Sequence, residues 1–226
     1  MKAGHPPRRE AVPWERIDTV LFDMDGTLLD RHFDDYFWEQ YLPEHYSLSH
    51  DLPIAEARIR LLARYRSVRD TLAWADLDFW SRELELDLPE LKQRIASLIA
   101  VRPGVPALLA HCRDAGKRLF LVTNAHHRSL ALKLRQTALA PWFDRIVCAQ
   151  EVGVAKEEPV FWPRLQTMLA YDPRQTLLVD DSEQVLRSAC RGGPAYLLFV
   201  AKPSSRRPAR HSTLFPSIES FREILP

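Results

Sequence analysis

The sequence predicts an α/β fold, with a parallel β-sheet core and an inserted segment that is all helical. Short apolar runs rich in Val, Ile, Leu and Phe alternate with helical stretches over most of the 226 residues. Such nearly continuous apolar runs are typical of parallel strands that are covered on both faces. Residues 31–100 interrupt this alternation and contain no good strand candidate. We therefore expect residues 1–30 and 101–226 to form the core, and residues 31–100 to form a helical insert.

Five apolar runs are predicted to be the strands of the core, and four stretches between them its helices. One helix is expected to end at Gly116 and the next before Pro141, because glycine and proline commonly stop helices. Strand–helix alternation of this kind predicts a parallel sheet. The strands are expected at 17–22, 118–122, 145–149, 176–179 and 195–200, and the helices at 104–115, 129–139, 159–170 and 183–191.

The helical insert is rich in aromatic residues. Trp38, Trp74 and Trp80 all lie within it. This density indicates either a tightly packed small bundle or a surface on which a planar ring can stack. The packed bundle is the commoner of the two, because aromatic side chains dominate small cores.

Composition and charge exclude some classes of function. The net charge is only +1, so there is no bulk electrostatic case for nucleic acid or an anionic membrane as partner. No run approaches the roughly 18 apolar residues that span a bilayer. The N-terminal segment 1–18 is polar and lacks the apolar stretch of a signal peptide. The tail that begins KPSSRRPARHS at Lys202 has the composition of a loop with solvated charges.

The cysteines indicate a reducing compartment. Cys112, Cys148 and Cys190 are far apart and odd in number, and they form no Cys-x-x-Cys pair. Their apolar neighbours predict small buried side chains rather than reactive thiols. We therefore expect a soluble cytoplasmic protein. The sequence does not predict its oligomeric state.

The strongest local signal is the segment VLFDMDGTLLD, in which an apolar strand runs directly into Asp23, Asp25 and Gly26. Alternation at the strand end points the two carboxylates the same way, and glycine permits a sharp turn. Ligands bind at this end of strands in open α/β sheets, and oxygen ligands suit Mg²⁺. A calcium loop of the EF-hand type is rejected, because Gly is fourth rather than sixth and a strand precedes it. Aspartates that merely cap a turn would explain this segment alone.

Three further elements weaken that simpler explanation. Asp180 and Asp181 follow another apolar strand, where adjacent acids repel each other unless a cation offsets their charge. Thr123 and Asn124 end a strand and open a helix, whose free N–H groups favour an anion. Lys156 lies in a loop and by itself is a weak signal. Together these residues place acids, a hydroxyl and a lysine at strand ends.

In this order and spacing, these four motifs resemble those of the haloacid dehalogenase superfamily of aspartate-nucleophile phosphatases over residues 17–200. The resemblance implies a Rossmann-like core, with residues 31–100 as the helical cap found in many members. Within the superfamily, the chain is most similar to bacterial GMP/IMP 5′-nucleotidases. That narrower similarity lies in DTVLFDMDGTLLD, FDDYFW, TLAWADLDFWSREL, LVTNAHHRSLALKL and LLVDDSEQVL.

The resemblance also implies roles for the motif residues in a hydrolysis that passes through an aspartyl-phosphate. Asp23 would be the nucleophile, and Asp25 the general acid and then the general base. An acid at position 25 favours phosphate over halide, because the dehalogenating members lack one. Mg²⁺ would be bound by Asp23, the backbone carbonyl of Asp25, Asp180 and Asp181. Lys156 would act in catalysis and, with Thr123 and Asn124, bind the phosphate.

The expected substrate is a small phosphate monoester, most specifically a purine nucleoside 5′-monophosphate such as GMP or IMP. Tyr36, Trp38, Trp74 and His126 are candidates for contact with it, although an exposed histidine at a helix start is the simpler interpretation of His126 and His127. Two alternatives stay open: a sugar-phosphate or phosphoglycolate phosphatase of the same superfamily, and a binding relative that has lost catalysis. One departure is noted, since Gln184 and Val185 stand where many members carry a further Asp or Asn.

Overall fold

The computed structural model describes residues 12–68 and 71–225. Six parallel strands form one sheet in the order β3-β2-β1-β4-β5-β6. This confirms the predicted α/β fold with a parallel sheet. Five strands overlap the five predicted runs, and the short β6 was not predicted. The bounds are β1 (Thr19–Phe22), β2 (Arg118–Thr123), β3 (Arg145–Cys148), β4 (Thr176–Asp180), β5 (Tyr196–Val200) and β6 (Ser217–Ile218).

Strand β1 lies at the centre of the sheet, between β2 and β4. Its last residue, Phe22, pairs in register with Leu121 of β2 and Val179 of β4. Side chains alternate between the two faces of the strand, so Val20 and Phe22 belong to one hydrophobic cluster and Leu21 to another. Because β1 and β4 run parallel and in register, the polar residues that follow them emerge at the same edge of the sheet.

Helices cover both faces of this sheet. Residues of α7 pack in the same cluster as Val20 and Phe22, and residues of α10 and α11 pack with Leu21. The core helices are α7 (Val105–Asp114), α8 (His127–Thr137), α9 (Ala149–Val152), α10 (Phe161–Leu169) and α11 (Glu183–Ala189), with 3₁₀ turns at Trp14–Arg16, Ala140–Trp142, Pro173–Gln175 and Phe221–Glu223. No helix of the described residues has the length and apolar character needed to cross a membrane.

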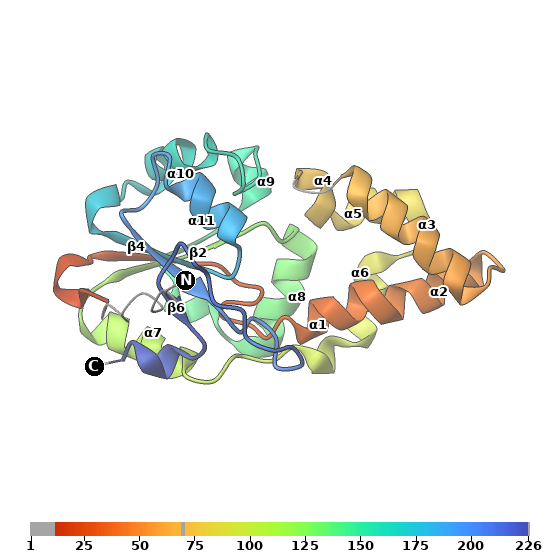
Figure 1. Ribbon diagram of the computed structural model, residues 1–226, viewed down its shortest axis with the longest axis horizontal. Coiled ribbons are helices and arrows are strands. Elements are labelled where there is room, and N and C mark those ends of the chain that lie inside the picture. Colours follow the sequence, from red (N-terminus) through yellow and green to blue (C-terminus); the bar gives the residue numbers. More distant parts are fainter. Residues whose placement is uncertain (1–11, 69–70, 226) are drawn as a thin grey trace, which may run out of the picture.

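The segment predicted as a helical insert stands to one side of the sheet in Figure 1. Its described residues contain no strand. A π-helical turn (Phe37–Tyr41) precedes Pro43, which lacks the N–H that a regular helix would use at that point. The remaining elements are α1 (His32–Tyr36), α2 (Leu42–Ser49), α3 (Ile54–Ser67), α4 (Leu72–Ala75), α5 (Leu77–Leu84), α6 (Leu88–Arg94) and the 3₁₀ turn Ala96–Leu98.

The insert has a hydrophobic cluster of its own, which includes the fully buried Phe37, Leu61 and Trp80. Leu132 of α8 belongs to the same cluster, so the insert packs against the core through that helix. Helix α5 begins at Asp76, whose carboxylate accepts hydrogen bonds from the backbone N–H groups of Asp78 and Phe79. Most of the aromatic side chains therefore serve packing, as the commoner interpretation held.

The cysteines and the C-terminal tail differ in part from what the sequence predicts. Cys190 is exposed, which contradicts the prediction that all three cysteines are buried, although Cys112 and Cys148 are. The tail from Lys202 is a loop, but its charges are not all solvated, because Arg207 forms ion pairs with Asp35 and Glu39 of the insert. Residues 1–11 of the polar N-terminal segment lie outside the described residues.

Candidate active site at the carboxyl ends of the strands

Three carboxylates meet where β1 and β4 end. Asp23 directly follows β1, Asp180 is the last residue of β4, and Asp181 follows it. One carboxylate oxygen from each lies within 4.8 Å of the others. The backbone N–H of Asp23 donates to the Val179 carbonyl at 3.0 Å, which continues the pairing of the two strands to this point. Adjacent parallel strands in register thus bring the two predicted acidic motifs together.

Burial and mutual repulsion disfavour the charged forms of these acids. Burial, followed in weight by the charges of Asp23 and Asp180, raises the pKa of Asp181 to about 8. Burial raises the pKa of Asp23 to about 6, against the opposing effect of Lys156. The buried Oδ2 of Asp23 has no hydrogen-bond partner. An all-oxygen group of buried acids, whose charge Lys156 offsets only in part, fits a hard cation such as Mg²⁺.

Gly26 is required by the close approach of this loop to the acids. Its φ of +92° is one that L side chains rarely adopt. A Cβ at this position would lie 2.3 Å from Oδ2 of Asp181. Any larger residue would therefore displace a carboxylate of the group, which explains the glycine in the DMDGT segment.

Lys156 is the buried cation of this cluster. Its Nζ lies 2.6 Å from Oδ1 of Asp23 and 2.7 Å from Oδ2 of Asp180, and it also donates to the Val122 carbonyl at 3.2 Å. The side chain is 2% exposed, although a lysine in a loop is usually solvated. Although burial opposes its charge, the two carboxylates raise the pKa of Lys156 well above its usual range. The ammonium is therefore permanent and partly offsets the acids.

Thr123 and Asn124 occupy the end of β2, beside the same cluster. Thr123 is buried, and its Oγ1 accepts from the backbone N–H of Ala125 at 3.0 Å. Asn124 accepts from the backbone N–H of Lys156 at 3.0 Å and donates to both carboxylate oxygens of Glu157. The Asn124 side chain is thus committed to holding the Lys156 loop in place.

Asp25 forms a second, separate cluster. Its Oδ1 lies 2.7 Å from Nζ of Lys133, which is also 2.7 Å from Oδ2 of Asp34. Nζ of Lys92 donates to the other oxygen of Asp34 at 2.6 Å. Burial raises the pKa of Asp25 to about 6, although Lys133 opposes the shift. The Asp25 carboxylate is not one of the three grouped acids, and only its backbone carbonyl was expected to bind a metal.

The sequence did not reveal Lys133 and Lys92, nor the partners of Asp34. Both lysines are almost fully buried, Lys133 on α8 and Lys92 on α6. A signal for Lys133 existed, because it lies three residues after Leu130 on the apolar side of its predicted helix. Lys92 gives no comparable signal.

Two arginines were also missed. Arg31 donates from Nη1 to Oδ2 of Asp181 at 2.8 Å, so a partly exposed guanidinium touches the acid group. Arg102 is buried and donates to the carbonyls of Gly26 and Thr27, both at 3.1 Å. Its other terminal nitrogen donates to the carbonyls of Lys202 at 2.7 Å and Glu219 at 3.0 Å. Arg102 therefore fastens the DMDGT loop to the C-terminal tail.

A cavity of about 870 Å³ lies between the acid group and the insert. Of the four candidates for substrate contact, Trp38, Trp74 and His126 line it, and Tyr36 does not. His126 is 4% exposed, which contradicts its interpretation as an exposed histidine at a helix start. His127, next to it, is exposed.

The aromatic wall of this cavity comes from the insert. The rings of Trp38 and Trp74 stack with centroids 5.9 Å apart and an interplanar angle of 23°. Tyr65 meets Trp74 edge to face at 5.6 Å. Trp74 is 36% exposed, so one side of this stack stays accessible. In the core wall, the exposed Gln184 lines the cavity.

Comparison with known proteins agrees with this geometry. Residues 17–191 match the haloacid dehalogenase-like hydrolase family. The chain is 34% identical over 215 residues to the GMP/IMP nucleotidase YrfG of Escherichia coli, covering 95% of this chain and 97% of that protein. It is 30% identical over 182 residues to an N-acetylmuramic acid 6-phosphate phosphatase of Pseudomonas aeruginosa, covering 79% of each.

A solved structure extends the comparison to the fold. The crystal structure of a HAD phosphatase from Thermococcus onnurineus has a TM-score of 0.77 and 27% identity to this chain. It covers 92% of this chain and 96% of its own. The predicted superfamily, fold and hydrolase class are confirmed by these matches. The chain therefore belongs to the haloacid dehalogenase-like hydrolase family.

Proposed function

We propose that this hydrolase is a Mg²⁺-dependent phosphomonoesterase that forms an aspartyl-phosphate on Asp23. The observation that carries the proposal is the group of Asp23, Asp180 and Asp181 beside Lys156, in a cavity lined by residues of both the core and the insert. This arrangement provides a nucleophile, a cation site and a fixed positive charge at one point. The names of the relatives support the phosphoric monoester hydrolase class.

In the first step, an oxygen of Asp23 attacks phosphorus, and the bond from phosphorus to the leaving alkoxide breaks. Asp25 gives its proton to that alkoxide. In the second step, Asp25 takes a proton from water, which attacks phosphorus and releases phosphate and free Asp23. A pKa of about 6 for Asp25 suits a group that must give and accept a proton near neutrality.

Lys156 and Thr123 bind the phosphoryl oxygens, and Asn124 keeps Lys156 in place through its backbone. Asp23, Asp180 and Asp181, with the backbone carbonyl of Asp25, would hold Mg²⁺. When bound, the ion neutralises charge on the phosphoryl oxygens. The raised pKa values of the three acids and the unpartnered Oδ2 of Asp23 support this assignment.

For the substrate, we propose a purine nucleoside 5′-monophosphate, GMP or IMP. The 34% identical relative bears the name of such an enzyme. A cavity of about 870 Å³ has room for a nucleotide, and the accessible side of Trp74 offers a surface for the base. Stacking on an aromatic side chain stabilises a base by about 1–3 kcal/mol. The free cysteines, two of them buried, support a reducing, cytoplasmic setting.

The test is phosphate release from a panel of monophosphates, measured with Mg²⁺ and with EDTA. We expect metal-dependent release that is highest with GMP and IMP and is lost in Asp23→Asn. Asp18→Asn, an exposed aspartate just before β1, is the matched control and should behave as wild type. Highest release with a sugar phosphate or phosphoglycolate would keep the mechanism and reject the substrate. No release by folded, metal-loaded protein would favour the non-catalytic alternative.

The base-binding surface has its own test. Trp74→Ala should raise KM for GMP about tenfold, in line with the loss of one stacking contact, while Trp74→Phe should retain most of the affinity. Neither change should alter KM for a small monoester that has no base. An equal rise in KM for both kinds of substrate would place the base elsewhere in the cavity.

A further inference from the structure

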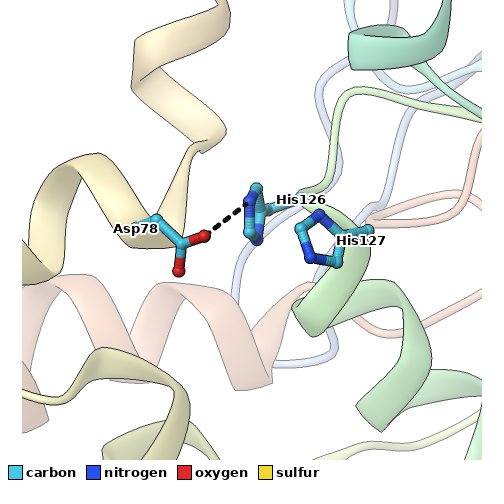
Figure 2. A group of neighbouring side chains, drawn as sticks. All are labelled: Asp78, His126 and His127. Carbon is cyan, nitrogen blue, oxygen red and sulfur yellow. Dashed lines mark ion pairs between the residues drawn. The ribbon is translucent and has the colours of Figure 1, made fainter.

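A second group of metal-ligating side chains lies at the junction of the insert and the core. Asp78 belongs to α5 of the insert, and His126 and His127 form the start of α8 in the core. One ligand atom from each lies within 4.8 Å of the others. In Figure 2, the His126 ring lies between Asp78 and His127. None of these residues belongs to the group of three acids at the strand ends.

His126 is a buried imidazole without adequate partners. It is 4% exposed, and its Nδ1 is buried with no hydrogen-bond partner. Its Nε2 is 3.5 Å from a carboxylate oxygen of Asp76 and 3.7 Å from one of Asp78, longer than an ordinary hydrogen bond. Leaving a buried polar nitrogen unpaired costs free energy. Both ring nitrogens of His126 are free of short hydrogen bonds, and the ring lies beside carboxylates and a second imidazole.

The second imidazole is placed to share that cation. The rings of His126 and His127 have centroids 4.0 Å apart, and His127 is exposed. Burial, and next the neighbouring His127, lower the pKa of His126. Neutral imidazole is the form that binds metals. Arg128 competes for the Asp78 carboxylate, since its Nε lies 3.4 Å from Oδ1.

We propose that Asp78, His126 and His127 form a site for a divalent transition metal of the Zn²⁺ type, which joins the insert to the core. Two imidazoles with a carboxylate favour Zn²⁺ over Mg²⁺, whereas the all-oxygen group at the strand ends favours Mg²⁺. Asp76 also lies beside the group, but its Oδ1, which faces His126, already accepts two backbone N–H groups of α5. The chain thus has two cation sites, which differ in the hardness of their ligands.

Binding at this site would draw the insert toward α8. Zinc holds nitrogen and oxygen ligands at about 2.0–2.2 Å, so its ligand atoms lie roughly 3.3 Å apart. The three candidate atoms lie within 4.8 Å of one another, so binding needs a contraction of at most about 1.5 Å. Because the ligands come from the two sides of the junction, the metal would tie them together.

The test is Zn²⁺ binding by isothermal titration in the presence of saturating Mg²⁺. Wild type should bind one Zn²⁺ that His127→Ala binds at least about tenfold more weakly. The same loss is expected for Asp78→Asn. His211→Ala, which removes an exposed imidazole 3.0 Å from Glu219, is the matched control and should bind as wild type. Asp181→Asn should retain this Zn²⁺, since that acid belongs to the other site.

A second measurement separates loss of the site from loss of the fold. Zn²⁺ should raise the melting temperature of wild type but not of His127→Ala, while both melt alike without it, because His127 is exposed. Unchanged Zn²⁺ affinity in folded His127→Ala and Asp78→Asn would overturn the proposal. So would binding that disappears in Asp181→Asn, because the metal would then lie among the three acids.

Discussion

Two aspartates that are two residues apart, Asp23 and Asp25, each contact a buried lysine, yet the two contacts are built differently. Lys156 joins Asp23 to Asp180, and all of its partners come from the strand ends of the core. Lys133 joins Asp25 to Asp34, which belongs to the insert, and Asp34 is held in turn by Lys92 of the insert. Burial raises the pKa of both aspartates to about 6.

The difference indicates that the core and the insert support different residues of the site. The contacts of Lys156 with Asp23 and Asp180 are made within the core, although Arg31, the first residue of the insert, reaches the neighbouring Asp181. The Asp25 cluster is complete only when the insert is seated on α8, because two of its four members belong to the insert. Asp25, which is proposed to transfer protons, therefore depends on the position of the insert. Asp23, the proposed nucleophile, is paired with a lysine of the core.

Removal of Lys156, the cation of the Asp23 cluster, should have the largest effect on turnover and stability. Lys156→Met leaves Asp23 and Asp180 without their ammonium, and we expect kcat to fall by a factor on the order of 10²–10³. Unfolding free energy should fall by about 3–5 kcal/mol, as for other broken buried pairs. Steady-state kinetics and urea denaturation measure the two losses. Lys202→Met, an exposed lysine, is the control; near-normal turnover in Lys156→Met would contradict the assignment.

Disruption of the Asp25 cluster, which consists of Asp25, Lys133, Asp34 and Lys92, should give a smaller catalytic effect. Lys133→Met frees the Asp25 carboxylate from its partner on α8, and we expect kcat to fall about 10–10²-fold through misplacement of the proton donor. Arg135→Met on the same helix removes an exposed cation and should leave kcat unchanged. The pH profile of kcat is the second readout. Loss of Lys133 raises the pKa of Asp25 further, so the limb that reports Asp25 should move to higher pH in Lys133→Met and stay in place in Arg135→Met. An unshifted limb would separate Lys133 from Asp25.

Affinity for Mg²⁺ should depend on pH through the group of three acids, and not through the Asp25 cluster. Burial and the neighbouring acids raise the pKa of Asp181 to about 8, so in the metal-free protein this carboxyl carries a proton at pH 6. Mg²⁺ must displace that proton, and affinity should rise by up to about tenfold per pH unit from pH 6, then level off above pH 8. Titration calorimetry should show the same dependence in Lys133→Met. A pH-independent affinity would contradict the raised pKa.

The smallest expected effect is on stability, through the coupling of Lys133 and Asp34 within the Asp25 cluster. Lys133 and Lys92 lower the pKa of Asp34 in spite of its burial, so Asp34 is ionised and its charge is shared. The double variant Lys133→Met/Asp34→Asn should therefore be more stable than the sum of the single losses predicts, by about 1–3 kcal/mol. Urea denaturation of the four proteins gives this coupling. Additive losses would show that the two side chains act independently.

The same contrast explains what the sequence could predict. The apolar runs located five strands, and the rule that parallel strands end at one edge brought Asp23 and Asp180 together in advance. Strand β6 was missed because two residues after Pro216 are too short a pattern to recognise. The Asp25 cluster was missed because Asp34 lies 58 residues from Lys92 and 99 residues from Lys133, and lysines on helices are usually solvated.

Arg102 has a consequence for the order in which the chain is made. The loop that carries Asp23 and Asp25 leaves the ribosome early, but the Arg102 side chain that fastens it also binds the carbonyls of Lys202 and Glu219. A nascent chain that ends before residue 219 leaves an N–H donor of this guanidinium without its carbonyl acceptor. We therefore expect the loop to settle only once translation is nearly finished, so that unfinished chains cannot hydrolyse substrate.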